Sequence, residues 1–105
     1  MQPKSVDLKR KYVKLRQRLT EILNRADPIG LLALGAPKDE YESEVGTILP
    51  RLKEAASARD IRRILHEEFV RWFDGEDIAG VENAYEAIAN EIWKDVLDGK
   101  PLSSS

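Results

Sequence analysis

The sequence predicts an all-α fold, a compact array of four main amphipathic helices with a short helical turn between the first two. Apolar residues recur at spacings of three and four, and they never alternate with period two over a useful length. Proline and glycine separate the periodic segments. Because the first connection is long and the second helix contains a proline, an irregular or orthogonal array is favoured over an up-and-down bundle.

The first helix is predicted from about Val6 to Arg25. Its apolar residues share one face, since they follow one another at helical spacing: Leu8, Tyr12, Leu15, Leu19 and Ile22. The pair Asp27-Pro28 ends this helix, because the residue before a proline is pushed out of helical geometry.

A short helical turn is predicted next, from Ile29 to Leu34. Asp27 suits the N-cap, Pro28 suits the first helical position, and Gly35 suits the end. We expect this segment to be mostly buried, since its large apolar side chains would be costly to leave in water.

The second helix is predicted to start at Asp39, which forms a capping-box pattern with Glu42. Its apolar face comprises Tyr41, Val45, Ile48 and Leu52. Pro50 lies inside this helix, lacks an N–H and crowds the carbonyl group four residues earlier. The helix is therefore expected either to kink there or to break into two segments.

The third helix is predicted from about Ala58 to Phe73, with Ser57 and Asp60 as its caps and Gly75 as its terminator. Its expected buried face is Ile61, Ile64, Leu65, Phe69 and Trp72.

The fourth helix is predicted from about Val81 to Leu97, and Gly99 and Pro101 end it. Its apolar stripe is wide enough to contact two neighbouring helices: Val81, Ala84, Tyr85, Ile88, Ala89, Ile92 and Val96.

The length of 105 residues suits a single domain over 1–105, with flexible ends expected at 1–5 and 99–105. The absence of cysteine excludes disulfides, thiolate metal sites and cysteine nucleophiles, and it agrees with a cytoplasmic protein. The N-terminus lacks the apolar core of a signal peptide, and no apolar run approaches the roughly 20 residues of a membrane span.

A family resemblance rests on five pieces of sequence: Asp27-Pro28-Ile29-Gly30-Leu31, Gly35-Ala36-Pro37, Asp39-Glu40-Tyr41, Glu44-Val45 and Ile48. Over roughly residues 20–95 the chain resembles the YugE-like proteins, a family of small bacterial proteins of unknown function. The resemblance implies a helical fold and a bacterial origin, and it implies no activity.

Reaction chemistry finds little support in the residues. His66 is the only histidine, lacks the second histidine of a zinc-protease motif, and is expected to lie exposed on a helix flank. EF-hand spacing and Glu-x-x-His motifs are absent. We therefore predict no catalytic residues, no metal site and no cofactor.

Charge is divided unevenly along the chain. Residues 1–25 carry a net charge of +6, and the remaining residues carry −8. The two parts either face each other in the fold or mark an interaction surface. Arg10, Lys14 and Arg18 form a ridge at i, i+4 and i+8 that is a candidate anion-binding site.

A candidate partner-binding site comprises Asp27, Asp39, Glu40, Tyr41 and Glu44. Glu40 and Glu44 lie one helical turn apart, where like charges cost about 0.2–0.5 kcal/mol. The alternative is an ordinary solvated acidic face. Tyr41 is also expected to pack in the core, with its hydroxyl reaching a backbone group or Asp27.

Three functions follow, in order of preference. The first is a non-enzymatic protein–protein interaction module, of which an immunity-type protein that neutralises a basic toxin is one form. The second is binding of nucleic acid or phosphate through the basic face of the first helix. The third is an enzyme that uses the acids Asp27, Asp39, Glu40 and Glu44.

Overall fold

The computed structural model describes residues 3–37 and 40–101, with the side chains of the first helix described from Arg10 onward. The described residues contain helices and turns and no strand. The helical segments in chain order are α1 (Pro3–Ala26), α2 (Glu42–Ile48), the 3-10 helix η1 (Leu49–Glu54), α3 (Ala58–Phe73), α4 (Glu76–Ala79), the 3-10 helix η2 (Glu82–Tyr85) and α5 (Glu86–Asp95). The predicted all-α fold is confirmed.

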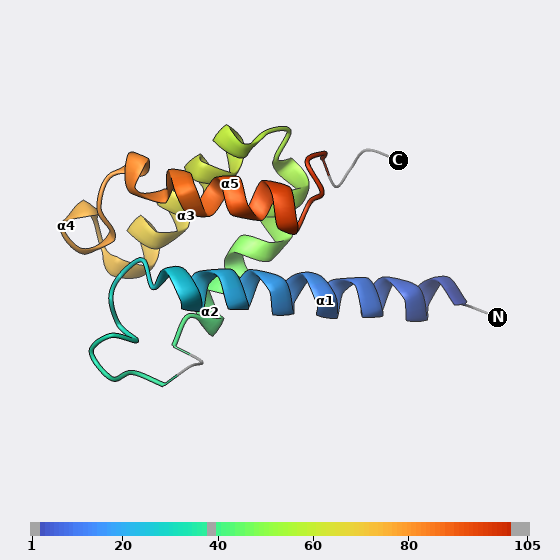
Figure 1. Cartoon of the computed structure of the whole chain (residues 1–105), viewed down its shortest axis with the longest axis horizontal. Coiled ribbons are helices and arrows are strands. Elements are labelled where there is room, and N and C mark those ends of the chain that lie inside the picture. The colour runs from blue at the N-terminus through green and yellow to red at the C-terminus, as the bar shows by residue number, and fades with distance from the viewer. Residues whose placement is uncertain (1–2, 38–39, 102–105) are drawn as a thin grey trace.

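The helices are arranged around α3, which packs mainly against α5 and also contacts α2, α4 and both 3-10 helices. The C-terminal half of α1 packs against α5 and α2, while its N-terminal half extends past the rest of the molecule (Figure 1). The molecule is elongated for this reason, with extents of 49 × 28 × 21 Å. The arrangement is irregular, as the long first connection and Pro50 predict.

The core forms where α1, α2, α3 and α5 meet. Its aromatic centre is Phe69, whose ring stacks on Tyr85 with 5.3 Å between centroids and meets Tyr41 edge-on at 6.1 Å. The aliphatic side chains around these rings are fully or almost fully buried: Leu19, Ile22, Leu23, Val45, Ile48, Leu52, Ile61, Ile64, Leu65, Ile88 and Ile92.

The apolar face of α1 is only partly covered. Leu19 and Ile22 are buried as predicted, and Leu15 is half-buried, but Tyr12 is 47% exposed. The side chain of Leu8 lies outside the described part. The prediction of one buried face is therefore wrong at Tyr12, because the neighbouring helices cover only the C-terminal half of α1.

The segment that follows α1 forms hydrogen-bonded turns instead of the predicted helix. Asp27 is not an N-cap: its backbone has φ 47°, and its N–H donates to the carbonyl of Leu23, so it terminates α1. Leu34 is 85% exposed, so the prediction of a mostly buried turn is wrong there. Ile29, Leu31 and Leu32 are half-buried against the core.

The predicted second helix breaks into two segments next to Pro50, which is one of the two predicted alternatives. The α-helix α2 ends at Ile48, and the 3-10 helix η1 begins with Leu49 and Pro50, where a missing N–H does least harm. The predicted face of this segment is buried throughout. The described helix begins at Glu42, and the expected cap Asp39 lies outside the described residues.

The third helix has the predicted bounds. The Ser57 hydroxyl accepts a hydrogen bond from the N–H of Asp60 at 3.3 Å, and the Asp60 carboxylate accepts one from the N–H of Ala56 at 2.8 Å. Trp72, predicted to be buried, is instead exposed, and its Nε1–H donates to the Thr47 hydroxyl at 3.0 Å.

The predicted fourth helix begins later than expected and is preceded by a helix that the sequence analysis did not predict. The unpredicted helix is α4, which follows the terminator Gly75 directly. Val81 is exposed because the chain is extended there, and helical structure resumes only at η2 and α5. From Tyr85 onward the predicted stripe is buried, whereas Ala84 is exposed.

At the two ends of the chain, residues 1–2 and 102–105 lie outside the described part. Helix α1 begins at Pro3, inside the segment 1–5 that was expected to be flexible, and the chain is described to Pro101 at the other end. Within the described residues, no helix combines the length and the apolar character needed to cross a membrane.

Candidate functional site

Tyr41 and Asp27 form a hydrogen-bonded pair that anchors the loop after α1. The buried Tyr41 hydroxyl donates to the Asp27 carboxylate at 2.6 Å and accepts from the N–H of Ile29 at 3.1 Å. The same carboxylate accepts from the N–H groups of Leu32 at 3.0 Å and Ala33 at 2.9 Å. The prediction that Tyr41 packs in the core and reaches Asp27 is confirmed, and both side chains have structural partners.

The ionisation of this pair follows from its surroundings. Burial raises the pKa of Tyr41 to about 12, and the hydrogen bond to Asp27 adds to this effect. Burial also raises the pKa of Asp27, but the hydrogen bonds from Tyr41 and from the backbone N–H groups together outweigh it and lower that pKa below 3.8. At neutral pH the loop is therefore held by a carboxylate that accepts from a neutral phenol.

Glu44 does not contribute to an acidic surface, because its side chain is only 5% exposed. Burial raises its pKa, and the negative charge of Glu40 raises it further. Position 44 lies three residues after Tyr41 and four before Ile48, so the apolar face of α2 includes it. Of the five predicted partner-binding residues, Glu40 is exposed, Asp39 lies outside the described residues, and the other three are anchored or buried.

Glu44→Gln is expected to raise the free energy of unfolding at pH 7, whereas Glu40→Gln should change it little. The pKa of the Glu44 carboxyl group is raised in the folded state, so the group stabilises the fold only at pH values below its unfolded-state pKa of 4.5. As the pH rises through the folded-state pKa, this stabilisation is lost. The gain from Glu44→Gln should therefore vanish near pH 4. Urea unfolding of both variants at pH 7 and pH 4 measures this gain in stability. A loss of stability in Glu44→Gln at pH 7 would contradict the prediction.

The predicted anion-binding ridge is divided by the fold. Arg10 and Lys14 are exposed on the projecting half of α1. Arg18 instead donates a hydrogen bond to the backbone carbonyl of Asp95, the last residue of α5. A cation at a helix C-terminus can hydrogen-bond a carbonyl that has no partner within the helix, and it interacts favourably with the negative end of the helix dipole. One of the three basic residues thus helps to dock α1 on α5.

Two shallow hollows follow the line where α1 meets the end of α5. One, of about 270 Å³, is lined by Arg18, Glu21, Ile22, Arg25 and Asp95. The next, of about 220 Å³, is lined by Lys11, Lys14, Leu15, Arg18, Val96 and Asp98. The lining of the second hollow combines two apolar side chains with three basic ones and one acid.

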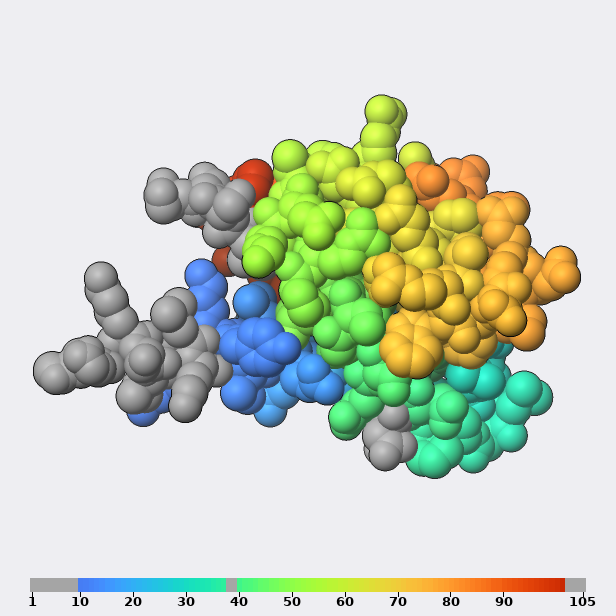
Figure 2. Space-filling model, turned by 180° about the vertical axis from the view of Figure 1, so that it is seen from behind, coloured from blue at the N-terminus to red at the C-terminus, as the bar shows by residue number. Residues whose placement is uncertain are grey.

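The part of α1 that begins this hollow, from Arg10 onward, is mostly exposed among the described residues. We call residues 10–15 of α1 the α1 arm: Arg10, Lys11, Tyr12, Val13, Lys14 and Leu15. Val13 is 52% exposed and lies beside the exposed Tyr12. In the space-filling view the arm stands to one side of the body (Figure 2). The arm therefore presents apolar side chains among three cations.

The sequence predicted that His66 lies exposed on a helix flank, and this prediction is wrong. Its ring is largely buried between α3 and α4, with Nε2 at 2.8 Å from the Glu76 carboxylate and 3.1 Å from the carbonyl of Gly80. Since both partners accept hydrogen bonds, Nε2 carries a proton. These partners could not be predicted from the sequence because α4 itself was not predicted. The contact ties α4 to α3.

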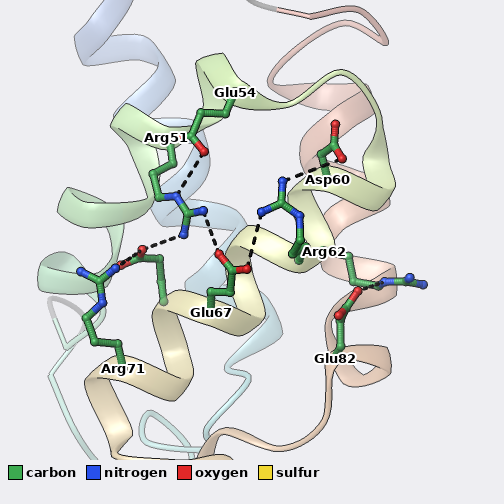
Figure 3. A network of polar contacts seen from close by, with 9 residues as sticks. Arg51, Glu54, Asp60, Arg62, Glu67, Arg71 and Glu82 are labelled. Atoms are coloured by element: carbon green, nitrogen blue, oxygen red, sulfur yellow. Dashed lines mark hydrogen bonds and ion pairs between the residues drawn. The ribbon is translucent and has the colours of Figure 1, made fainter.

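A second unpredicted cluster joins η1 to α3 (Figure 3). The Arg51 guanidinium donates to Glu68 at 2.9 Å and to Glu67 at 2.8 Å, and Arg71 reaches the same Glu68 carboxylate at 3.1 Å. The Glu68 side chain is only 1% exposed. Glu68 lies at helical spacing between Leu65 and Trp72, as Glu44 does between Tyr41 and Ile48, and this spacing was the signal of a buried acid in the sequence.

Across residues 3–37 and 40–101, no group of three or more histidine, aspartate or glutamate side chains is placed to hold a metal ion. In comparisons with known proteins, no family model, no curated protein and no solved structure matches this chain.

Proposed function

We propose that the protein is a non-enzymatic protein–protein interaction module whose α1 arm binds an acidic, partly apolar surface of a partner. The observation that carries this proposal is the exposure of Tyr12 and Val13 on a helix whose later apolar side chains, Leu19, Ile22 and Leu23, are buried. Tyrosine and arginine are frequent among residues that dominate binding energy. The cations around them favour an acidic partner.

The polar clusters of the described residues support a non-enzymatic role. Asp27 and Tyr41 hold the first loop, His66 and Glu76 hold α4, and Arg51 holds η1 against α3. Each cluster already has a structural task. A bacterial, cytoplasmic setting belongs to the same proposal, supported by the resemblance to the YugE-like proteins and by the lack of cysteine.

The surface proposed here differs from the one that the sequence suggested. An immunity-type protein for a basic toxin would need an acidic face, and the α1 arm is basic. The second candidate function is binding of nucleic acid or phosphate, which the exposure of Arg10 and Lys14 on one side of the arm favours.

A photo-crosslinking amino acid placed at position 12 or 13 tests both proposals in cells of the source organism. We expect a protein adduct at these positions and none at position 90, where the exposed Asn90 of α5 serves as the matched control. An adduct that nuclease removes would favour the nucleic-acid function instead. Equal adducts at all three positions, or no adduct at any, would overturn both.

A further inference from the structure

The end of the molecule opposite the α1 arm has a complementary surface. We call it the α4 end: α4 with the residues that flank it, 74–82. Ile78 and Val81 are each 58% exposed there, and the segment carries Asp74, Glu76, Asp77 and Glu82. From Trp72 to Trp93 the chain contains six acidic residues and no lysine or arginine.

The acids of the α4 end are only partly balanced by their own chain. Glu76 contacts His66 but keeps 55% of its side chain exposed, and Glu82 pairs with Arg62 at 2.9 Å. Asp74 and Asp77 are exposed. A cationic surface that also covers Ile78 and Val81 would therefore gain both charge attraction and apolar burial.

The arm and the α4 end cannot meet within one molecule. Figure 1 places α4 at one extreme of the longest axis and the start of α1 at the other. Residues 10–15 lie on the part of α1 that extends away from α4. Two copies of the chain can bring the surfaces together, since each copy offers one basic and one acidic end.

We propose that the α1 arm of one copy docks on the α4 end of a second copy. Tyr12 and Val13 pack against Ile78 and Val81, and Lys11 and Lys14 face the acids around them. The contact joins different surfaces, so each added copy leaves one arm and one α4 end free and the assembly grows head to tail. This inference rests on the proposed function in using the arm as an interface, and it names a second copy as an occupant.

The wild-type protein is therefore expected to form larger species as its concentration rises at low ionic strength. In about 1 M salt, where the Debye length is roughly 3 Å, the association should weaken strongly. Sedimentation velocity over a concentration series measures both effects. A wild-type protein that stays monomeric up to about 1 mM at low salt would overturn the inference.

Charge reversal provides the decisive test, because the two ends can be changed separately. The arm variant is Lys11→Glu with Lys14→Glu, and the end variant is Glu76→Lys with Asp77→Lys. The arm variant carries negative charge at both ends, and the end variant leaves its α4 end without a net charge, so the self-association of each should be about a hundredfold weaker than that of the wild type. An equimolar mixture should form pairs, because the unaltered arm of the end variant can bind the unaltered α4 end of the arm variant.

The controls separate charge from folding. Lys53→Glu with Arg59→Glu reverses two exposed charges elsewhere and should associate like the wild type. Because Glu76→Lys removes a partner of His66, circular dichroism checks that the end variant still folds. Asp77→Lys alone is a second end variant that keeps the contact between His66 and Glu76. A mixture of arm and end variants that stays monomeric, or variants that each associate like the wild type, would contradict the proposal.

The outcomes also distinguish this inference from the proposed function. A monomeric wild-type protein that still yields a host-protein adduct at position 12 overturns head-to-tail docking and leaves the proposed function standing. Association that depends on both ends, together with adducts only between copies of this chain, supports the inference and removes the need for a different partner.

Discussion

Replacing Arg51 with methionine is expected to lower the free energy of unfolding by about 3–5 kcal/mol. The Glu68 carboxylate is almost completely buried, and its bond to Arg51 is shorter than its bond to Arg71, 2.9 Å against 3.1 Å. Without Arg51 only Arg71 remains, and its side chain is 69% exposed, where solvent screens its charge. A buried, poorly compensated carboxylate is among the costliest defects in a folded protein.

The partners of Arg51 explain why its loss should affect more than one carboxylate. Arg51 also hydrogen-bonds Glu67, lowers the pKa of that group, and lies 3.5 Å from Glu54 of its own 3-10 helix. Arg51 therefore fixes η1 on α3 immediately after the break at Pro50. The cluster stabilises the point where the helix geometry changes.

Two companion variants separate this explanation from a simple loss of packing. Arg71→Met should lower the free energy of unfolding by at most about 1 kcal/mol, since Glu68 then still pairs with Arg51. Arg51→Met combined with Glu68→Met should recover much of the loss, because a buried ion pair can be replaced by apolar side chains with little net cost. Urea unfolding followed by circular dichroism measures all three. A double variant as unstable as Arg51→Met would contradict the role assigned to the buried charge.

The parts of the fold that the sequence predicts well are those with local signals. Helix α3 has its predicted bounds because Ser57 caps it and Gly75 follows its last turn. The break at Pro50 follows from proline geometry, and the contact between Tyr41 and Asp27 follows from an aromatic hydroxyl that needs a partner when buried. In each case the decisive residues lie within a few turns of each other.

The parts that the sequence did not predict depend on contacts between distant segments. Helical periodicity shows that Tyr12 and Leu19 share a face, but it cannot show that the fold buries Leu19 and leaves Tyr12 47% exposed. The partners of His66 appear only once α4 folds back beside α3. The acidic residues near Glu44 suggested a surface, yet the apolar face of α2 takes Glu44 into the interior. The candidate site therefore moves from the acids to the α1 arm.

Asp27→Ala is expected to lower the free energy of unfolding by about 2–3 kcal/mol, because it removes the acceptor of three hydrogen bonds. The buried Tyr41 hydroxyl would lose the group to which it donates. The Asp27 backbone has φ 47°, so alanine would add strain that asparagine tolerates better. Asp27→Asn is therefore the matched control for the carboxylate charge, and Asp27→Gly is the control for the backbone.

The pH dependence of stability gives this prediction a second readout. Because the folded-state pKa of Asp27 is lowered, its contribution is fully present above the unfolded value of 3.8 and is lost as the pH falls below it. Tyr41, with its pKa raised from 10.0 to about 12, contributes below pH 10 and loses that contribution as the pH rises toward 12. Asp27→Asn should flatten the acid limb of the stability profile, and Tyr41→Phe should flatten the alkaline limb. Urea unfolding between pH 2 and 5 that gives Asp27→Asn and the wild type the same slope would show that the carboxylate charge does not hold the loop.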